Sequence, residues 1–353
     1  MRALTLQGKT FQVTDLPDPS PAAGQLLVRP LFTGICGSDL SLRKQMADLA
    51  DATPAEAQGQ LPIIVPGHEF SGEVIGVAPG TETELKPGDR VTGLPFTHSH
   101  DGPACIGLSP FHSGGLATLS CVDAVRSFRV PDGIPDDLAA LTEPLSVGLH
   151  AVNLANRNEG PNMVIGCGPV GLAVIMSLKI AGRGPILAAD FSAERRAVAA
   201  SLGADIVLDP ATDSPYERWS DLGHQPAPMS PLLARDFRGQ PHGLNIFECT
   251  GAPGVMGQII QSAPAHSHII VVGVCPHEEK ITPLEGITRE LALEFSFAYR
   301  PGEFSTALGL IEAHADLAAR MITSRQPLAS TEAAFDALAK DPHEIKILID
   351  PNA

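Results

Sequence analysis

This chain of 353 residues has few positive charges, few cysteines and no long apolar run. Its 24 lysines and arginines stand against 40 aspartates and glutamates, which gives a formal net charge of −16. A phosphate backbone or an anionic lipid surface would repel such a chain, so we expect neither a nucleic acid nor a membrane as partner. The sequence lacks both an apolar run of about 18 residues, the length of a membrane span, and the apolar core of a signal peptide. We therefore expect a cytoplasmic protein.

The cysteines are scattered, without the C-x-x-C pairs of many metal sites or the dense framework of small secreted domains. Most are expected to be reduced thiols packed as small apolar residues. The six cysteines are Cys36, Cys105, Cys121, Cys167, Cys249 and Cys275.

The chain is long enough for two domains, and 44% of its residues are apolar, which provides ample core.

A glycine-rich turn organises the second half of the sequence. An apolar run from Met163 to Ile165 meets Gly166, Gly168 and Gly171 in G-x-G-x-x-G spacing, and an apolar segment of helical length follows. The first glycine permits a sharp turn, the second lets the backbone approach a pyrophosphate, and the third lets the helix lie close to the strand. The pattern predicts a strand, a tight turn and a helix over 169–181, with the positive end of the helix facing phosphates.

A second apolar run, over 186–189, ends on Asp190, 24 residues after Gly166. A dinucleotide-binding fold places at this distance the acid that binds the adenosine ribose hydroxyls. Asp190 would repel a 2′-phosphate, and Phe191 rather than an arginine follows it, so NAD is favoured over NADP. Arg195 and Arg196 leave NADP open as the alternative.

Four motifs precede this turn. Cys36 lies in a glycine-flanked segment before a Ser-Asp pair, and the pair His68 and Glu69 heads an alternating strand. The run 86–91 predicts a turn into a strand, and Glu143 lies in an apolar setting at the start of a helix. In this order, and followed by the glycine turn, the motifs resemble the zinc-dependent medium-chain alcohol dehydrogenases, especially the sorbitol and threonine dehydrogenase branch. The resemblance covers essentially the whole chain.

The resemblance implies an α/β plus β fold, in which a GroES-like catalytic domain carries an inserted Rossmann dinucleotide-binding domain. We expect the catalytic domain at 1–147 and 297–353 and the Rossmann domain at 148–296, in a homodimer or homotetramer. Later strands over 244–251 and 268–274 would bring further residues to the cofactor, because ligands of open α/β sheets bind at the carboxyl ends of the strands. The expected cofactor-binding residues are Gly166, Gly168, Pro169, Val170, Gly171, Asp190, Phe191, Arg195, Thr250, Gly251, Val272, Gly273 and Val274.

Hydride transfer from an alcohol requires an alcohol that is deprotonated near neutral pH, and zinc achieves this by lowering the pKa of a bound oxygen. A catalytic zinc takes three protein ligands and keeps a fourth position open. Cys36, His68 and one carboxylate fit this set. Their separations carry no local metal-binding signal, so the assignment rests on the motifs and the resemblance. Taken singly, each residue could equally be a buried thiol, a hydrogen-bonded strand histidine or a carboxylate at a helix start.

Glu69 and Glu143 compete for the third ligand position. Cysteine, histidine and one glutamate leave the zinc site neutral, whereas a second bound glutamate would make it negative and oppose loss of the alcohol proton. We therefore expect the two carboxylates to exchange, or one of them to bind through water. Glu143 is expected to be the resident ligand and Glu69 to visit the metal when substrate is absent.

Neighbouring residues complete the expected site. The resemblance implies that Ser38 links the alcohol to the proton path and that Asp39 orients a ligand histidine. Ser41 stands where relatives commonly carry the outer base of this relay, so the proton could instead leave through water or the ribose hydroxyls. The segment 43–54 looks longer than usual and is either part of the substrate pocket or a surface helix.

Many relatives bind a structural zinc through four closely spaced cysteines in the lobe corresponding to 93–121. This segment holds only Cys105 and Cys121, so we expect one catalytic zinc and no structural zinc. His98, His100 and His112 could substitute, but histidines in a polar, glycine-rich loop are more often exposed to solvent.

The leading hypothesis is a zinc- and NAD-dependent enzyme that reversibly oxidises a secondary alcohol or polyol to a ketone. One alternative is a zinc-free quinone or enoyl reductase of the same fold, but such enzymes generally lack the ligands Cys36 and His68 and prefer NADPH. Another is a nucleotide-binding relative without catalytic activity. The retained ligand candidates argue against it, although Ser41 is what a decaying site could show.

Overall fold

The computed structural model describes residues 1–99, 102–155, 160–223 and 243–353. The chain forms two compact units: Met1–Glu143 together with Phe304–Ala353, and Pro144–Glu303. The first unit thus ends four residues before the expected boundary at 147 and resumes seven residues after the expected 297. No helix among the described residues is long and apolar enough to cross a membrane.

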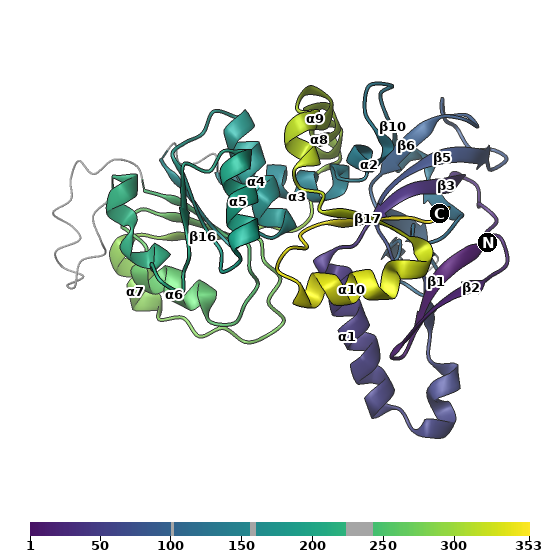
Figure 1. The fold of residues 1–353 in the computed structure, drawn as a ribbon, viewed down its shortest axis with the longest axis horizontal. Helices are drawn as coiled ribbons and strands as arrows, with labels where there is room; N and C mark the ends of the chain where they lie inside the picture. The colour runs from purple at the N-terminus through teal and green to yellow at the C-terminus, as the bar shows by residue number, and fades with distance from the viewer. Residues whose placement is uncertain (100–101, 156–159, 224–242) are drawn as a thin grey trace. The chain divides into compact units, whose positions relative to one another are not determined.

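Antiparallel sheets dominate the first unit (Figure 1). A three-stranded sheet has the order β2-β1-β4, and a larger sheet has the order β10-β6-β5-β3-β18-β17, with β9 beside β3 and a separate hairpin β7-β8. The larger sheet joins strands from both ends of the chain, because β18 pairs with β3. The strands are β1 (Arg2–Gln7), β2 (Thr10–Asp15), β3 (Gln25–Gly34), β4 (Ile63–Ile64), β5 (Glu69–Val77), β6 (Arg90–Gly93), β7 (Phe96–Ser99), β8 (Gly102–Cys105), β9 (Ser120–Asp123), β10 (Ser127–Arg129), β17 (Ser324–Pro327) and β18 (Ile347–Asp350).

Helices cover parts of these sheets. One core cluster joins Leu4 and Leu6 of β1 to Met46 of α1 and Phe335 of α10. A second lies between β3, β5, β6 and β9. The helices of this unit are α1 (Gly37–Ala52), η1 (Ala55–Gln60), η2 (Ala124–Arg126), α2 (Asp136–Ala139), α8 (Pro301–Ala313), α9 (Ala315–Ala319), η7 (Leu328–Ser330) and α10 (Thr331–Lys340).

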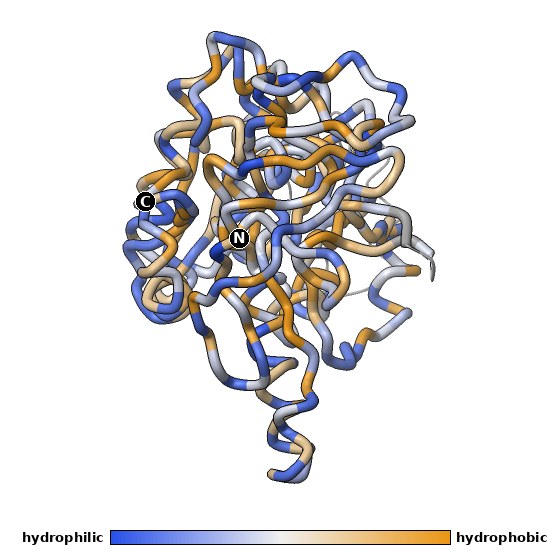
Figure 2. Tube along the Cα trace, turned by 90° about the vertical axis from the view of Figure 1, so that its right-hand side faces the viewer, coloured by the Kyte–Doolittle hydropathy of each residue, from blue (hydrophilic) through white to orange (hydrophobic). Residues whose placement is uncertain are grey.

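The segment 43–54 belongs mainly to helix α1. Its apolar side packs into the first core cluster, and Arg43 pairs with Asp336 of α10 at 2.6 Å while Asp51 pairs with Lys9 at 2.5 Å. The following η1 buries none of its residues, and Figure 2 shows this lowest part of the chain in mixed hydrophilic blue and pale colours. Of the two interpretations of this segment, a part of the substrate pocket or a surface helix, the structure shows the surface helix.

The second unit is a parallel sheet with helices on both faces. The strand order β13-β12-β11-β14-β15-β16 is that of a doubly wound dinucleotide-binding fold, which confirms the fold class. Helices α4 and α5 lie on one face, and α6 and α7 lie on the other (Figure 1). The central strands are buried along their length, as expected when both faces are covered. The elements are α3 (Thr142–Leu154), β11 (Asn162–Ile165), α4 (Pro169–Ile180), β12 (Ile186–Ala189), α5 (Ala193–Leu202), β13 (Ile206–Leu208), η4 (Pro215–Glu217), η5 (Trp219–Leu222), β14 (Asn245–Glu248), α6 (Val255–Ser262), β15 (His268–Val271), α7 (Pro283–Arg289) and β16 (Ala292–Phe295).

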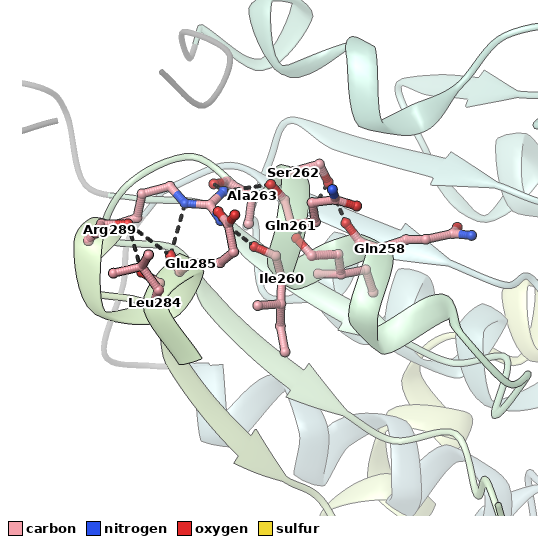
Figure 3. A network of polar contacts seen from close by, with 10 residues as sticks. Gln258, Ile260, Gln261, Ser262, Ala263, Leu284, Glu285 and Arg289 are labelled. Atoms are coloured by element: carbon pink, nitrogen blue, oxygen red, sulfur yellow. Dashed lines mark hydrogen bonds and ion pairs between the residues drawn. The ribbon is translucent and has the colours of Figure 1, made fainter. Parts of the chain in front are cut away.

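The buried guanidinium of Arg289 ties α7 to the end of α6 (Figure 3). It donates to the carbonyl oxygens of Ile260, Gln261 and Ala263, at distances of 2.6 to 3.0 Å. The last carbonyls of a helix have no partner within the helix, so a buried helix end needs such donors. Glu285 also accepts from Arg289, at 2.9 Å. This network closes the C-terminal end of α6.

The segment 209–240 is rich in proline and charge, and its sequence predicts a helix plus a surface loop. Its described part, residues 209–223, has two short 3-10 helices, η4 and η5, because Pro215 begins the first and Gly223 ends the second in the left-handed conformation. Trp219, the one tryptophan, packs into the core of the second unit. The rest of the segment, from residue 224, lies outside the described residues.

Candidate metal centre and dinucleotide site

Cys36 lies where β3 passes into α1, directly before the first helical residue. Its backbone N–H donates to Asp39 Oδ2 at 2.9 Å, so Asp39 stabilises the start of the helix. The preceding residue, Ile35, donates its N–H to the carbonyl of Ile347 at 3.1 Å. The cysteine is therefore held by its own helix and by the C-terminal strand.

His68 and Glu69 reach the same place from β5. Glu69 pairs with Gly34 of β3 across the sheet. A Cβ atom at Gly34 would lie 2.2 Å from Glu69 Oε2, so only glycine leaves room for the carboxylate. Gly67, with φ of +100°, turns the chain just before His68. Two glycines thus position the histidine and the glutamate.

Cys36, His68 and Glu69 form one group of possible metal ligands. Each offers a ligand atom, and these atoms all lie within 4.8 Å of one another. The ligand atoms of a tetrahedral zinc lie about 3.3 to 3.7 Å apart, given its usual bond lengths. Small side-chain movements would therefore close this set around zinc. A thiolate, an imidazole and a carboxylate are all common zinc ligands, so the residues fit the metal.

The two ring nitrogens of His68 face different partners. Nε2 lies 3.2 Å from Ser38 Oγ, and Nδ1 lies 3.5 Å from Asp39 Oδ1. Nδ1 and this carboxylate oxygen are both buried and make no hydrogen bond. A slight approach would let Nδ1 donate to Asp39 and leave Nε2 free to bind a metal, which is the usual arrangement of a metal-binding histidine.

Charges around His68 favour its protonated form. Burial lowers the pKa of His68, but Asp39 and Cys36 together raise it, so that it lies well above its usual range. A metal ion binds only neutral imidazole, so metal binding at this group competes with protons.

Lys346, which sequence reasoning missed, reaches this site from the residue before β18. Its Nζ contacts Glu69 Oε1 at 2.9 Å, Glu69 Oε2 at 2.6 Å and the carbonyl of Ile35 at 3.1 Å. Both Lys346 and Glu69 are 0% exposed. Burial lowers the pKa of Lys346, but Glu69, Cys36 and Glu143 together outweigh burial, so the pKa is raised and the lysine remains charged.

Glu143 is buried in the first turn of α3 but does not join the group of three ligand atoms. It lies near enough to act on its neighbour Cys105. Burial raises the pKa of the Cys105 thiol to about 11, His68 lowers it and Glu143 raises it. The structure therefore brings Glu69, rather than Glu143, beside Cys36 and His68. Which carboxylate is the resident ligand stays a prediction.

A second metal site was not expected in the lobe 93–121. Cys105 and Cys121 are free cysteines, and within the described residues the only group of three possible ligands is that of Cys36. The side chains of His98 and His100 lie outside the described part of the chain. The expectation of a single zinc therefore stays a prediction.

The glycine turn of the second unit has the geometry that a dinucleotide needs. Gly166 has φ of +93°, and a Cβ at Gly171 would lie 1.9 Å from the carbonyl oxygen of Gly166. At Gly168, by contrast, a Cβ would meet no atom within 4 Å, so the backbone is open to a ligand. Pro169 and Val170 begin α4 directly after it. The turn thus leaves space where a pyrophosphate would approach the helix start.

Asp190 is fixed beside this turn. Its Oδ2 accepts the N–H of Cys167 at 2.7 Å, and its Oδ1 accepts the N–H of Ser192 at 2.8 Å. Phe191 is 74% exposed. Arg196 is occupied by the carbonyls of Asp190 and Phe191 and by a pair with Asp209, whereas the buried Nε of Arg195 makes no hydrogen bond.

Buried Glu248, also missed from sequence, shapes the ends of β14 and β15. Its Oε1 accepts from the N–H groups of Thr250 and Gly251, at 2.7 and 3.0 Å, and from the Thr250 hydroxyl. A Cβ at Gly273 would lie 2.7 Å from Glu248 Oε2. Of the other expected cofactor residues, Val272 is buried and Val274 is 86% exposed. The sequence signal that could have found Glu248 is its position at the end of a strand, directly before Cys249, Thr250 and Gly251.

Two family models match the chain. The model described as alcohol dehydrogenase GroES-like domain matches residues 22–132, and the model described as zinc-binding dehydrogenase matches residues 169–313. The (R,R)-butanediol dehydrogenase of Bacillus subtilis (strain 168) is 32% identical over 359 aligned positions, covering 98% of this chain and 97% of that protein. The sorbitol dehydrogenase of Homo sapiens is 27% identical, covering 94% of this chain and 90% of that protein.

Solved structures agree with this similarity. The crystal structure of 2R,3R-butanediol dehydrogenase from Bacillus subtilis aligns with a TM-score of 0.80 and 28% identity, covering 99% of each chain. Galactitol-1-phosphate dehydrogenase from Escherichia coli has the same TM-score at 24% identity, covering 99% of this chain and 100% of that chain, and therefore supports the fold alone.

Proposed function

Because this chain belongs to the zinc-dependent medium-chain alcohol dehydrogenase family, we propose that it reversibly oxidises a secondary alcohol or polyol to a ketone with zinc and NAD. The observation that carries the proposal is the group of Cys36, His68 and Glu69, whose ligand atoms lie within 4.8 Å of one another. The relatives named for butanediol and sorbitol have substrates with a secondary hydroxyl beside another hydroxyl. We therefore favour such diols and polyols as substrates.

In this proposal, Cys36, His68 and one of Glu69 and Glu143 hold a single catalytic zinc. Zinc lowers the pKa of an alcohol oxygen toward neutrality. Asp39 orients His68 through Nδ1, which lies 3.5 Å from its carboxylate. Ser38 Oγ, 3.2 Å from His68 Nε2, takes up the alcohol proton. Ser41 donates to the carbonyl of Gly37 within α1, so beyond Ser38 the proton leaves through water or the ribose hydroxyls.

The proposed cofactor is NAD, bound along the glycine turn of Gly166, Gly168 and Gly171. Asp190 supports this choice, because its carboxylate is fixed by two backbone N–H groups beside the turn and would repel a 2′-phosphate. Arg195 favours NADP as the alternative, since its buried Nε has no hydrogen-bond partner. We favour NAD over this alternative, because Asp190 directly follows β12 beside the glycine turn.

The two other readings receive less support. A zinc-free quinone or enoyl reductase would have no need for a buried thiol, imidazole and carboxylate gathered in one place. A nucleotide-binding protein without activity would have no need for Asp39 to face His68. We also propose a cytoplasmic homodimer or homotetramer. The edge strand β16 supports assembly, because Phe295 and, after it, Phe297 are exposed there.

The first test replaces Cys36 with alanine. Turnover should fall at least about a thousandfold, because the alcohol would lose the cation that stabilises its deprotonated form. NAD binding should change little, since the glycine turn belongs to the other unit. Activity would be measured with NAD on a panel of secondary alcohols, polyols and amino alcohols, and NADH binding by fluorescence.

Cys121→Ala is the matched control, because this thiol lies in the same unit but outside the ligand group. It should retain turnover and zinc. Elemental analysis should give about one zinc per wild-type chain and less in Cys36→Ala. The proposed function would be rejected if Cys36→Ala kept most activity, or if wild-type protein purified without chelators held no zinc.

A further inference from the structure

Lys346 uses every donor that it has at the candidate metal centre. An ammonium group carries three N–H donors, and the three acceptors are both oxygens of Glu69 and the carbonyl of Ile35. The charged side chains of Lys346 and Glu69 are both fully buried. Full burial of a lysine is rare unless it is paired, so the pair has a defined partner and position.

The same carboxylate faces two cations in the zinc-loaded protein. A carboxylate has about four acceptor positions, and the lysine occupies two of those of Glu69. The carboxylate also supplies one of the three ligand atoms that lie within 4.8 Å of one another. Glu69 can therefore approach a metal without leaving Lys346. Its attraction to that metal is reduced by the ammonium that it already contacts.

Charge balance gives the lysine a further role. Cys36, Glu69 and Glu143 together carry three negative charges when deprotonated, whereas zinc carries two positive ones. Lys346 supplies the missing positive charge, which allows both carboxylates to lie near the metal without making the site negative. No other ammonium or guanidinium in the described part of the chain pairs with Glu69.

We propose that Lys346 is a positioning residue that keeps Glu69 a weak, exchangeable zinc ligand by offsetting its charge. This inference rests on the proposed function. Without the ammonium, zinc would be the only cation near the buried carboxylate. Glu69 would then bind the metal firmly, and the metal-free protein would carry an unpaired buried charge, so zinc should be held more tightly.

The test follows zinc loss from the full-length, zinc-loaded protein into excess EDTA. In Lys346→Met the half-life of bound zinc should be about tenfold longer than in the wild type. Outer partners of metal ligands typically change metal affinity by about 10- to 100-fold, usually by supporting the metal, whereas this partner opposes it. If the lysine acts through Glu69, adding Lys346→Met to Glu69→Gln should change the half-life by less than about twofold. The double variant removes both charges and so leaves no unpaired ion.

If the ion pair of Lys346 and Glu69 has a purely structural role, the opposite change in the half-life of bound zinc is expected. If Lys346 only joins the start of β18 to β5 and to the residue after β3, Lys346→Met should loosen the sheet and release zinc at least as fast as the wild type, which would overturn the proposal. A tenfold gain that persists in the Glu69→Gln background would also overturn it, because the lysine would then act on zinc directly. Lys340→Met, on the exposed face of α10, is the control and should leave the half-life unchanged.

Folding of each variant would be checked by circular dichroism. If Lys346→Met does not fold, Lys346→Gln replaces it and should give the same direction of change. Zinc analysis of the wild type separates the two proposals. If the wild type holds no zinc, both the proposed function and the role of Lys346 are rejected. If the wild type is zinc-loaded and active but Lys346→Met loses zinc faster, only the role of Lys346 is rejected.

Discussion

Among single side chains, Asp190 is the residue that we propose to set the choice between the two nicotinamide cofactors. In Asp190→Ala the affinity for NADH should fall about tenfold or more, because hydrogen bonds to a charged group contribute about 1.5–3 kcal/mol each. The affinity for NADPH should rise relative to NADH, since the repulsion of a 2′-phosphate disappears with the carboxylate. Fluorescence titration with both reduced cofactors measures the ratio.

A matched control is Asp213→Ala, which removes an aspartate of the same unit that pairs with Arg218 instead. It should leave both dissociation constants unchanged. A wild-type protein that already prefers NADPH, or an Asp190→Ala variant with an unchanged ratio, would contradict the assignment of Asp190.

Sequence motifs found the residues that the chain places in short, recognisable contexts. Cys36 closely follows Gly34, which leaves room for Glu69, and His68 follows Gly67, which is in the left-handed region. Lys346 has no such context. It lies 277 residues from Glu69 and meets it only because β18 pairs with β3. A lysine before a closing strand carries no local signal, so only the folded sheet shows the pair.

Among elements, the link from α7 to α6 depends on Arg289. In Arg289→Met, three carbonyl oxygens at the end of α6 lose a buried donor, so the free energy of unfolding should fall by about 3 kcal/mol. Urea unfolding followed by circular dichroism would measure the loss. Zinc retention should not change, because the network lies in the second unit.

The control for this variant is Arg218→Met, whose guanidinium pairs with aspartates at a partly exposed site. Exposed pairs contribute about 0 to 1 kcal/mol, so its effect should be much smaller. If the free energy of unfolding fell equally in the two variants, neither the burial of Arg289 nor its bonds to carbonyl oxygens would explain the loss.

Hydrophobic periodicity predicted the elements around the glycine turn closely: β12 has the expected bounds, and α4 ends one residue before the expected 181. These elements are buried between neighbours, so their pattern is dictated by the core. Of the segment 209–240, where a helix and a surface loop were expected, the structure describes residues 209–223 and shows no α-helix in them, so the expectation stays a prediction. Prolines and short polar runs there support only single 3-10 turns, and Trp219 is fixed by tertiary packing that no local pattern shows.

For the molecule as a whole, Glu303 links stability to pH. Burial raises the pKa of Glu303, but the N–H of Arg300, Asn153 and His150 together lower it below its usual value. A carboxylate with a lowered pKa stabilises the fold above its unfolded pKa, near about 4.3, and this contribution is lost as the pH falls through the folded value. The free energy of unfolding should therefore fall as the pH is lowered below about 4.

Glu303→Gln tests this dependence. At pH 7 the variant should be less stable than the wild type by about 1 kcal/mol, because a charge-assisted bond to His150 at 2.9 Å becomes neutral. The difference should shrink as the pH is lowered through 4 toward 3, since the wild-type carboxylate is then protonated as well. Urea midpoints at several pH values measure it, and a constant difference across this range would argue against the carboxylate.

The pairing of Lys346 with Glu69 also has a consequence for synthesis on the ribosome. Pro144–Glu303 forms a compact unit that precedes Lys346 in the chain, so the whole unit is translated before the lysine. Glu69 belongs to β5, and β18 joins the same sheet later in the chain by pairing with β3. During translation the nascent chain must therefore keep a carboxylate destined for burial in water until Lys346 has emerged. A chain cut short before residue 346 would retain its glycine turn yet have no counter-charge for Glu69 at the candidate metal centre.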